Sequence, residues 1–274
     1  MGARLGQGLI VTNAHVVNAG TEFTVAVNGR QRTARLVGNA PCEDLAVLRV
    51  TDTSNLRTLP LGSQEGVKEG ETVVAVGFPG SLSNRDQLTT TTGVVSVAHT
   101  RLSAPEVFDV PLYSNVILTD TAINPGNSGG PLVDLDARLV GVNSAGGSGQ
   151  NQNFAIGVDR VKAVTADLRE GRSVGWTGME FTYRTQSVVD QLPSVGLPKD
   201  VAGLVITNVV PGTPAAEAGL RVPALLIAVD GRAIDSRLHS YCLRAGQGTS
   251  GNSATFRVIE PNATRTRDLS IGFE

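Results

Sequence analysis

The stretch Asn124-Pro125-Gly126-Asn127-Ser128-Gly129-Gly130-Pro131 is the most informative in the chain. A serine between glycines can expose its hydroxyl group while neighbouring backbone N–H groups face one point, and such a point can hold an oxyanion. The same string is also compatible with an ordinary turn, because Gly and Asn adopt a positive φ at little cost. Its meaning therefore depends on what else the chain offers.

A reactive serine needs a base and a group that orients the base. The candidates are His15, in Thr12-Asn13-Ala14-His15-Val16-Val17, and Asp44, in Glu43-Asp44-Leu45-Ala46-Val47-Leu48. Taken alone, His15 would more often be a partly buried structural histidine, and Asp44 could merely begin a strand. The order His, Asp, Ser, with each residue where a strand meets a loop, favours one shared site.

At these residues the chain resembles the trypsin-like serine proteases, and specifically the HtrA/Deg branch. The resemblance continues through Asn153-Phe154-Ala155-Ile156 and into a PDZ-like C-terminal region, so it covers nearly the whole chain. It implies that His15, Asp44 and Ser128 form a catalytic triad and that the backbone N–H groups of Gly126 and Ser128 form the oxyanion hole. This chemistry requires no cofactor.

Two further positions bear on regulation and specificity. Digestive trypsin-like enzymes carry an aspartate before the serine that pairs with a newly cut N-terminal amine; the neutral Asn127 argues against activation by that ion pair here. In this class the base of the specificity pocket lies six residues before the nucleophile, at Ala122. The other wall is expected from the uncharged Asn143, Ser144 and Ala145, so the pocket should prefer small or medium apolar side chains.

The first part of the chain consists of short Val-rich runs separated by turn residues, which indicates an all-β barrel or sandwich. These runs cover 9–12, 23–27, 46–50, 73–78, 93–97, 116–119 and 139–142. With His15 and Asp44 before Gly77 and Ser128 after it, the double β-barrel of trypsin-like proteases fits, with the site between the barrels. Residues 159–169 are then expected to form a helix.

The second part changes to a smaller α+β pattern. The expected fold is mainly β, with a trypsin-like protease domain over 1–170, a linker over 171–175 and a PDZ domain over 176–274. In that domain the sequence predicts strands at 203–210 and 224–229, a turn and short helix within 211–220, a helix at 236–245 and two final strands. The string from Val210 to Leu220 strongly resembles HtrA-type PDZ domains.

PDZ domains bind a peptide C-terminus by adding it as a strand. The carboxylate-loop motif matches Trp176-Thr177-Gly178-Met179, and the groove is expected between this segment and the helix that carries Leu238, Tyr241 and Cys242. Trp176 could instead be a simple core anchor at the domain junction. After Leu220 the family usually has Pro-Gly-Asp, whereas this chain has Val222-Pro223-Ala224, so ligand preference does not carry over.

The two cysteines, Cys42 and Cys242, fall in different expected domains. A bridge between them would lock the domains together, but two cysteines do not make a disulfide framework. Buried free thiols are the favoured interpretation. No clustered His/Cys spacing suggests a metal site.

The composition fits a folded two-domain protein of 274 residues with a formal charge of −2, which offers no reason to propose nucleic acid or an anionic membrane as a partner. No apolar stretch reaches the roughly 18 residues that span a bilayer, and no signal peptide or anchor is recognisable. HtrA-like proteins are usually exported or anchored and have another strand before this point. The resemblance therefore favours an extracytoplasmic location and a barrel that lacks its N-terminal strand.

Two functions remain open on the sequence. The first is an ATP-independent serine endopeptidase that cuts unfolded or exposed protein segments in quality control or regulated proteolysis, with the PDZ domain binding peptide C-termini. The second is a catalytically resting or inactive peptide-binding or holdase module. The complete triad favours the first. A homo-oligomer is compatible with the resemblance.

Overall fold

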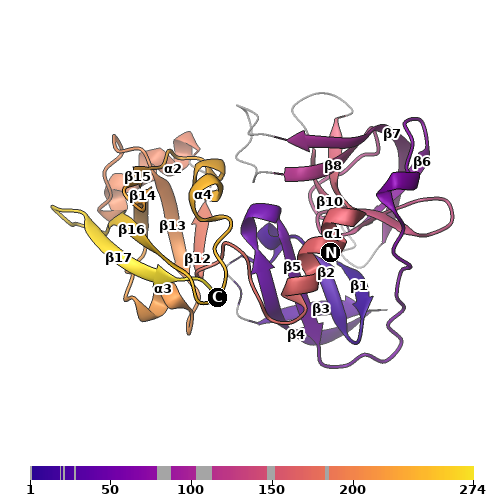
Figure 1. Ribbon diagram of the computed structural model, residues 1–274, viewed down its shortest axis with the longest axis horizontal. Helices are drawn as coiled ribbons and strands as arrows, with labels where there is room; N and C mark the ends of the chain where they lie inside the picture. The colour runs from indigo at the N-terminus through magenta and orange to yellow at the C-terminus, as the bar shows by residue number, and fades with distance from the viewer. Residues whose placement is uncertain are drawn as a thin grey trace.

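The computed structural model describes residues 2–18, 20, 22–27, 29–78, 88–102, 113–146, 152–182 and 185–274. Their strands form three groups: an open sheet, a closed barrel and a C-terminal sheet (Figure 1). The open sheet and the barrel pack together, and the third group lies beside the open sheet. The mainly β architecture confirms the fold class expected from the sequence.

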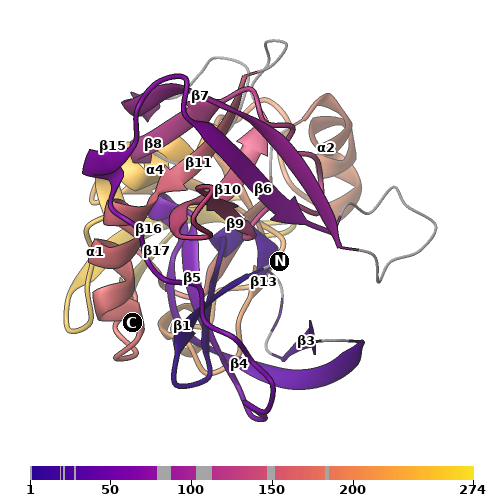
Figure 2. The same ribbon diagram turned by 90° about the vertical axis from the view of Figure 1, so that its right-hand side faces the viewer.

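The N-terminal sheet has the strand order β1-β2-β5-β4-β3 and is open at its β1 and β3 edges (Figure 2). Its strands are β1 (Ala3–Gly6), β2 (Leu9–Thr12), β3 (Phe23–Val27), β4 (Arg30–Ala40) and β5 (Leu45–Val50). Strands β2 and β5 are almost wholly buried, which is typical of central strands covered on both faces. The segment that follows β2 carries His15, and the segment that follows β5 leads into the barrel.

The second group closes into a barrel with the order β10-β11-β8-β7-β6-β9. It comprises β6 (Thr72–Gly77), β7 (Thr89–Leu102), β8 (Tyr113–Thr119), β9 (Pro131–Val133), β10 (Leu139–Gly146) and β11 (Asn153–Gly157). Buried Val, Leu, Ile and Ala side chains fill the interior, among them Val73, Ile117 and Leu132. Since aromatic residues make up only 4% of the chain, small aliphatic side chains supply most of this packing.

Helix α1 (Val158–Leu168) follows the barrel and packs against the first sheet. Its apolar face, with Val161, Val164 and Leu168, joins Leu45 and Val47 of β5 in one core cluster. Gly38 allows the close approach, because a Cβ at that position would lie 2.7 Å from the carbonyl oxygen of Leu168. The helix expected over 159–169 is thus present, and it ties the two strand groups together.

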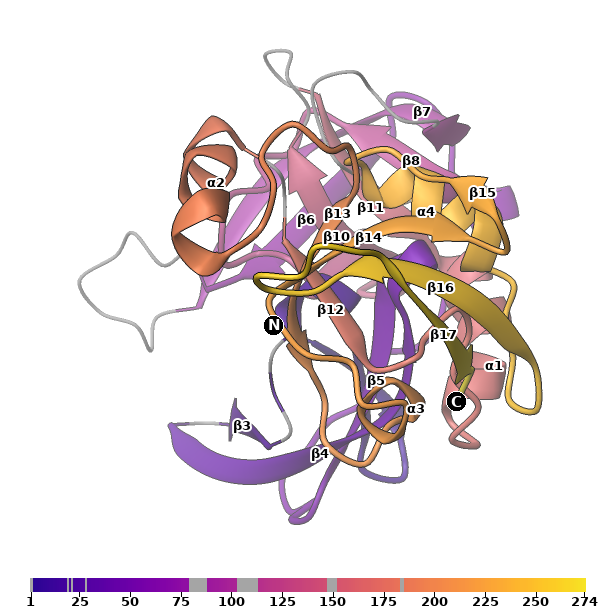
Figure 3. The ribbon, with the colours of Figure 1, turned by 90° about the vertical axis from the view of Figure 1, so that its left-hand side faces the viewer.

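The C-terminal sheet has the order β12-β13-β14-β16-β17, with β15 paired to β14 (Figure 3). Its strands are β12 (Met179–Thr182), β13 (Leu204–Val209), β14 (Ala224–Val229), β15 (Arg232–Ala233), β16 (Ser253–Ile259) and β17 (Arg267–Gly272). The helices beside it are α2 (Gln186–Gln191), the 3₁₀ helix η4 (Leu192–Val195), α3 (Pro214–Glu217) and α4 (Leu238–Ala245). Helix α4 lies on the side that faces the N-terminal sheet (Figure 1).

The segment between the two parts is held by hydrogen bonds to both. The N–H of Val174 donates to the carbonyl oxygen of Asn39 (3.0 Å), and the N–H of Asn39 donates to Ser173 Oγ (3.1 Å). On the other side, the N–H of Gly175 donates to the carbonyl oxygen of Gly248 (2.7 Å). Residues 171–175 therefore connect the two parts as an ordered strap.

A disulfide bond joins Cys42 to Cys242, across 200 residues of sequence, with the Cα atoms 5.4 Å apart. The expectation of two buried free thiols is therefore wrong. Both residues are buried as expected, at 5% and 7% exposure, but the fold packs α4 against the 3₁₀ turn η2 (Pro41–Glu43) and brings the sulfur atoms together. Cys42 consequently belongs to the apolar core of the C-terminal part.

Among the described residues, no helix is long and apolar enough to cross a membrane.

Candidate active site

Asp44 ends the turn η2 in a left-handed conformation, with φ 52° and ψ 38°. Aspartate is one of the few residues that adopt this conformation with little strain. The side-chain amide of Asn13 donates to the carbonyl oxygen of Asp44 (2.9 Å), and both residues are buried. The backbone of the loop before His15 is thereby fixed to the backbone of Asp44.

The turn η2 is also anchored through its neighbouring side chains. Glu43 accepts two hydrogen bonds from the guanidinium group of Arg160 on α1, one of them 2.8 Å from Arg160 Nε to Glu43 Oε2. These hydrogen bonds raise the pKa of Arg160 despite its partial burial. Together with the Cys42 bridge, this ion pair fixes the two residues that precede Asp44 to opposite parts of the molecule.

His15 lies on the 3₁₀ turn η1 (Ala14–Val16), directly after β2. Its Nδ1 atom is 2.8 Å from Asp44 Oδ1 and 3.0 Å from Oδ2, and its backbone N–H donates to Oδ1 (3.1 Å). Burial lowers the pKa of His15, but the hydrogen bond to Asp44 and the charge of that carboxylate outweigh it, so the pKa is raised above 6.5. With Nδ1 donating to Asp44, Nε2 of the neutral ring is left as an acceptor.

Ser128 lies between two glycines with positive φ, Gly126 (103°) and Gly129 (79°). The N–H of Asn127 donates to the carbonyl oxygen of Asn124 (2.9 Å), which closes a turn with Pro125 second and Gly126 third. That sequence and the positive φ are typical of a type II turn. The hydroxyl of Ser128 donates to the carbonyl oxygen of Ser144 (2.9 Å), which places the loop against β10.

Asn127, the residue before the serine, is buried. Its amide nitrogen lies 3.4 Å from the carbonyl oxygen of Ala122, and its Oδ1 has no hydrogen-bond partner within the described part of the chain. Gly77 leaves room for this side chain, because a Cβ at Gly77 would collide with it. A neutral amide therefore occupies the space under the Ser128 loop.

Two residues enter the site that the sequence did not assign to it in this role. The hydroxyl oxygens of Ser144 and Tyr113 lie within hydrogen-bond distance of Asp44 Oδ2, at 2.7 and 3.0 Å. Ser144 was expected to form a pocket wall, whereas Tyr113 was not singled out. Its position at the start of a strand, just before the polar Ser114 and Asn115, gives no signal of a contact with a carboxylate 69 residues away.

The other residues expected to form the specificity pocket differ from one another in exposure and in hydrogen bonding. Ala122 is exposed, and its carbonyl oxygen accepts a hydrogen bond from the hydroxyl of Thr91 (2.8 Å). Asn143 is fully buried and donates to the carbonyl oxygen of Pro131 (3.1 Å). Since the side chains of Asn143 and Ser144 are both buried and engaged, only their main chain can face a substrate; Ala145 continues strand β10 beside them.

The expected peptide-binding residues gather around β12 and α4. The carbonyl oxygens of Trp176, Thr177 and Gly178 accept hydrogen bonds from Glu274, Ala215 and Val210, so the loop is fixed on its carbonyl side. All four residues from Trp176 to Met179 lie near the core, and Leu238 is half-buried.

Tyr241 and Cys242 are engaged in internal contacts that the sequence did not predict for residues lining a groove. The Tyr241 ring lies 4.8 Å from that of Phe181 on β12, and its hydroxyl donates to the carbonyl oxygen of Gly175 (2.9 Å). Burial raises the pKa of Tyr241 strongly. Cys242 is bonded to Cys42, so it is not available as a free groove wall.

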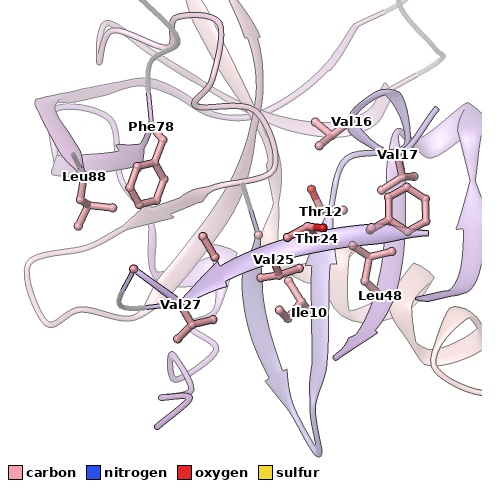
Figure 4. Close-up of a pocket in the computed structure, with 14 residues that line it drawn as sticks. Ile10, Thr12, Val16, Val17, Thr24, Val25, Val27, Leu48, Phe78 and Leu88 are labelled. Carbon is pink, nitrogen blue, oxygen red and sulfur yellow. The ribbon is translucent and has the colours of Figure 1, made fainter. Parts of the chain in front are cut away.

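A cavity of about 610 Å³ opens on the N-terminal sheet next to the turn that carries His15 (Figure 4). Apolar side chains from β2, β3 and β5 line it, together with Val16, Phe78 and Leu88. Within the described part of the chain, no group of His, Cys, Asp and Glu residues is arranged to hold a metal ion.

The raised pKa of His15 leads to a prediction that does not depend on activity. In an NMR titration, the imidazole of His15 should titrate above the ordinary value of 6.5. Because the folded pKa is the higher one, the charged ring stabilises the fold fully below pH 6.5, and this contribution is lost as the pH rises through the raised pKa. Asp44→Asn should lower the pKa of His15, since burial then acts without the carboxylate. An unchanged pKa in that variant would contradict the assignment.

Known protein families and individual proteins are similar to this chain over most of its length. The profile of the trypsin-like peptidase domain matches residues 1–142, and that of the PDZ domain matches residues 205–258. A probable periplasmic serine endoprotease DegP-like of Halomonas elongata is 37% identical over 272 residues, which are 97% of this chain and 54% of the relative. The serine protease Do-like HtrA of Bacillus subtilis is 35% identical over 281 residues, covering 97% of this chain and 61% of that protein.

Among solved structures, the HtrA-type protease AlgW with a decapeptide superimposes with a TM-score of 0.56 at 31% identity, covering 98% of this chain and 80% of that one. The chain thus spans little more than half the length of the curated relatives, but most of this solved relative. It belongs to the HtrA-type branch of the trypsin-like peptidase family.

Proposed function

We propose that the chain is a serine endopeptidase that hydrolyses peptide bonds in unfolded or exposed protein segments without using ATP. The observation that carries this proposal is the hydrogen bond from His15 to the buried Asp44, with Ser128 held against Ser144 beside that carboxylate. We take residues 1–170 as the protease domain and 176–274 as the PDZ domain.

In the proposed reaction, the hydroxyl of Ser128 attacks the peptide carbonyl while Nε2 of His15 takes its proton. The bond from Nδ1 to Asp44 fixes the tautomer in which Nε2 can accept that proton, and the carboxylate stabilises the imidazolium that forms. The imidazolium then protonates the leaving amine. Water repeats the sequence on the acyl-enzyme and releases the second product.

The oxyanion is proposed to lie between the backbone N–H groups of Gly126 and Ser128. The turn from Asn124 to Asn127 supports this role, because a positive φ at Gly126 sets the orientation of the peptide plane that carries its N–H. Such preorganised donors are worth about 100- to 1,000-fold in turnover. The ordered turn favours an active protease over a resting binding module.

The specificity pocket is proposed to lie between Ala122 and the main chain of Asn143, Ser144 and Ala145. None of these residues carries a charge that could pair with Lys or Arg. The PDZ domain is proposed to bind peptide C-termini along the edge of β12, beside α4.

The Cys42–Cys242 bridge supports two further points. Disulfide bonds persist in oxidising compartments, and the curated relatives are named periplasmic, so we place this protein outside the cytoplasm. The bridge also connects α4 to the residue two positions before Asp44. Peptide binding beside α4 can therefore act on the catalytic turn through a covalent link.

The first test concerns the nucleophile. A serine-directed phosphonate should label Ser128 alone, and Ser128→Ala should lower the turnover of an unfolded protein by about four to six orders of magnitude. Labelling is located by mass spectrometry of peptides. Undiminished cleavage by Ser128→Ala, or a label on another residue, would exclude the proposed role and favour the binding module.

The second test concerns the pocket. Cleavage of a denatured protein mixture should produce fragments that end in Ala, Val, Leu or similar residues, because burying Lys or Arg without a partner is costly. The C-terminal residues of the fragments are read by mass spectrometry, with Ser128→Ala as the control digest. Enrichment of Lys or Arg would contradict the apolar pocket.

The third test concerns coupling between the domains. A peptide with a free apolar C-terminus should change the cleavage of a short reporter by about 5- to 150-fold, and the amidated peptide should have no effect. The effect should shrink in both Cys42→Ala and Cys242→Ala, which remove the same bond from opposite sides. A full effect in both variants, at a saturating peptide concentration, would exclude the bridge as the connection.

A further inference from the structure

The carboxylate of Asp44 is held by more than the histidine it orients. Oδ1 accepts hydrogen bonds from the ring and the backbone of His15, and Oδ2 faces the hydroxyl groups of Ser144 and Tyr113 at 2.7 and 3.0 Å. The two hydroxyl oxygens are also 2.7 Å from each other. Asp44, Ser144 and Tyr113 are all at most 4% exposed. Three buried oxygen-bearing side chains thus form a triangle behind His15.

The protons in this triangle can be counted. Each hydroxyl carries one proton, and the ionised carboxylate carries none, so at most two of the three contacts hold a proton. Either both hydroxyls donate to Oδ2, or one hydroxyl donates to the other, which then donates to Oδ2. In both arrangements Tyr113 contributes one of the two protons that surround the buried charge. A buried carboxylate requires such donors, because its transfer from water is otherwise costly.

The hydroxyl of Tyr113 is held in place by the barrel. Tyr113 begins β8, and its ring packs edge-on against Phe154 of the paired strand β11, with ring centroids 5.3 Å apart. Both rings belong to the core cluster shared by the first sheet, the barrel and α1. The hydroxyl of Tyr113 therefore reaches Asp44 from a strand of the barrel, whereas Asp44 itself lies at the end of the turn η2.

We propose that Tyr113 is a positioning residue of the triad. Its hydroxyl, directly and through Ser144, supplies a hydrogen-bond donor to the buried carboxylate of Asp44 and fixes the direction in which that carboxylate faces Nδ1 of His15. This inference rests on the proposed function for its effect on turnover, but its effect on His15 does not.

The substitution Tyr113→Phe removes only the hydroxyl and keeps the ring contact with Phe154. With one donor fewer on Oδ2, less of the carboxylate's negative charge is offset by other hydrogen bonds, so it attracts the imidazolium more strongly and the pKa of His15 should rise further. In the reaction, kcat should fall by about 10- to 100-fold, the effect of one hydrogen bond to a charged group, with KM nearly unchanged. The acid limb of kcat/KM should move to higher pH.

The experiment compares Tyr113→Phe with Ser144→Ala and with Thr165→Val. The hydroxyl of Thr165 is also buried, but it donates to the carbonyl oxygen of Val161. This hydrogen bond lies within α1 and does not involve Asp44 or His15. All rates are normalised to the active sites titrated with a phosphonate, so that loss of folded protein does not count as loss of kcat. Thr165→Val should leave the pH profile in place, whereas Tyr113→Phe and Ser144→Ala should both shift it.

The pKa of His15 is measured in parallel by NMR. An unmoved pKa together with an unchanged kcat per active site in Tyr113→Phe would overturn the proposal. If Tyr113→Phe does not fold, an unmoved pKa in Ser144→Ala, which breaks the same triangle, would overturn it equally. A moved pKa in a chain that cuts no substrate would overturn the proposed function and support the positioning role.

Discussion

The arrangement of the molecule depends on keeping one ionised carboxylate, that of Asp44, buried at the end of the short turn η2. Three different interactions hold this turn: the Cys42 bridge to α4, the Glu43 ion pair to α1, and the amide of Asn13 on the Asp44 carbonyl. Each comes from a different part of the chain. The turn is therefore the point at which the N-terminal sheet, the helix α1 and the C-terminal domain meet.

The same carboxylate connects the two halves of the protease. From the first half, His15 contributes its ring and its backbone N–H, while Tyr113 and Ser144 approach from strands of the barrel. Ser144 in turn presents its carbonyl oxygen to the hydroxyl of Ser128. A buried charge shared in this way is unfavourable unless every partner is in place, since removing one partner leaves the charge unsatisfied. The cost of burial thus favours the one packing of the halves in which His15, Tyr113 and Ser144 all reach Asp44.

Most of the barrel strands and the three expected site residues could be predicted from the sequence, because short local patterns indicate them. The Val-rich runs gave most of the barrel strands, and three short strings located His15, Asp44 and Ser128. Strand β4 is not predicted by the sequence pattern, since its first half, from Arg30 to Arg35, is polar apart from Ala34 and pairs mainly with the edge strand β3. Helix α2 was also missed, and its residues are half-buried or exposed, so no apolar face announces it.

The features that were misjudged are those that depend on contacts distant in sequence. The bridge requires α4 to pack on η2 across 200 residues, and no spacing rule expresses that. Likewise, the side chain of Ser144 could line a pocket or turn inward, and only the position of Asp44 and Tyr113 decides for the inward direction.

The proposed function requires Asp44, His15, Ser128 and the turn at Gly126 to form one preassembled site. The most direct measurement is a crystal structure of the oxidised chain after reaction with a peptidyl phosphonate. The proposed site predicts phosphorus bonded to Ser128 Oγ, one phosphonyl oxygen about 3 Å from the backbone nitrogens of Gly126 and Ser128, and Nδ1 of His15 still hydrogen-bonded to Asp44. A phosphonyl oxygen directed away from both nitrogens, or a His15 ring separated from Asp44, would contradict it.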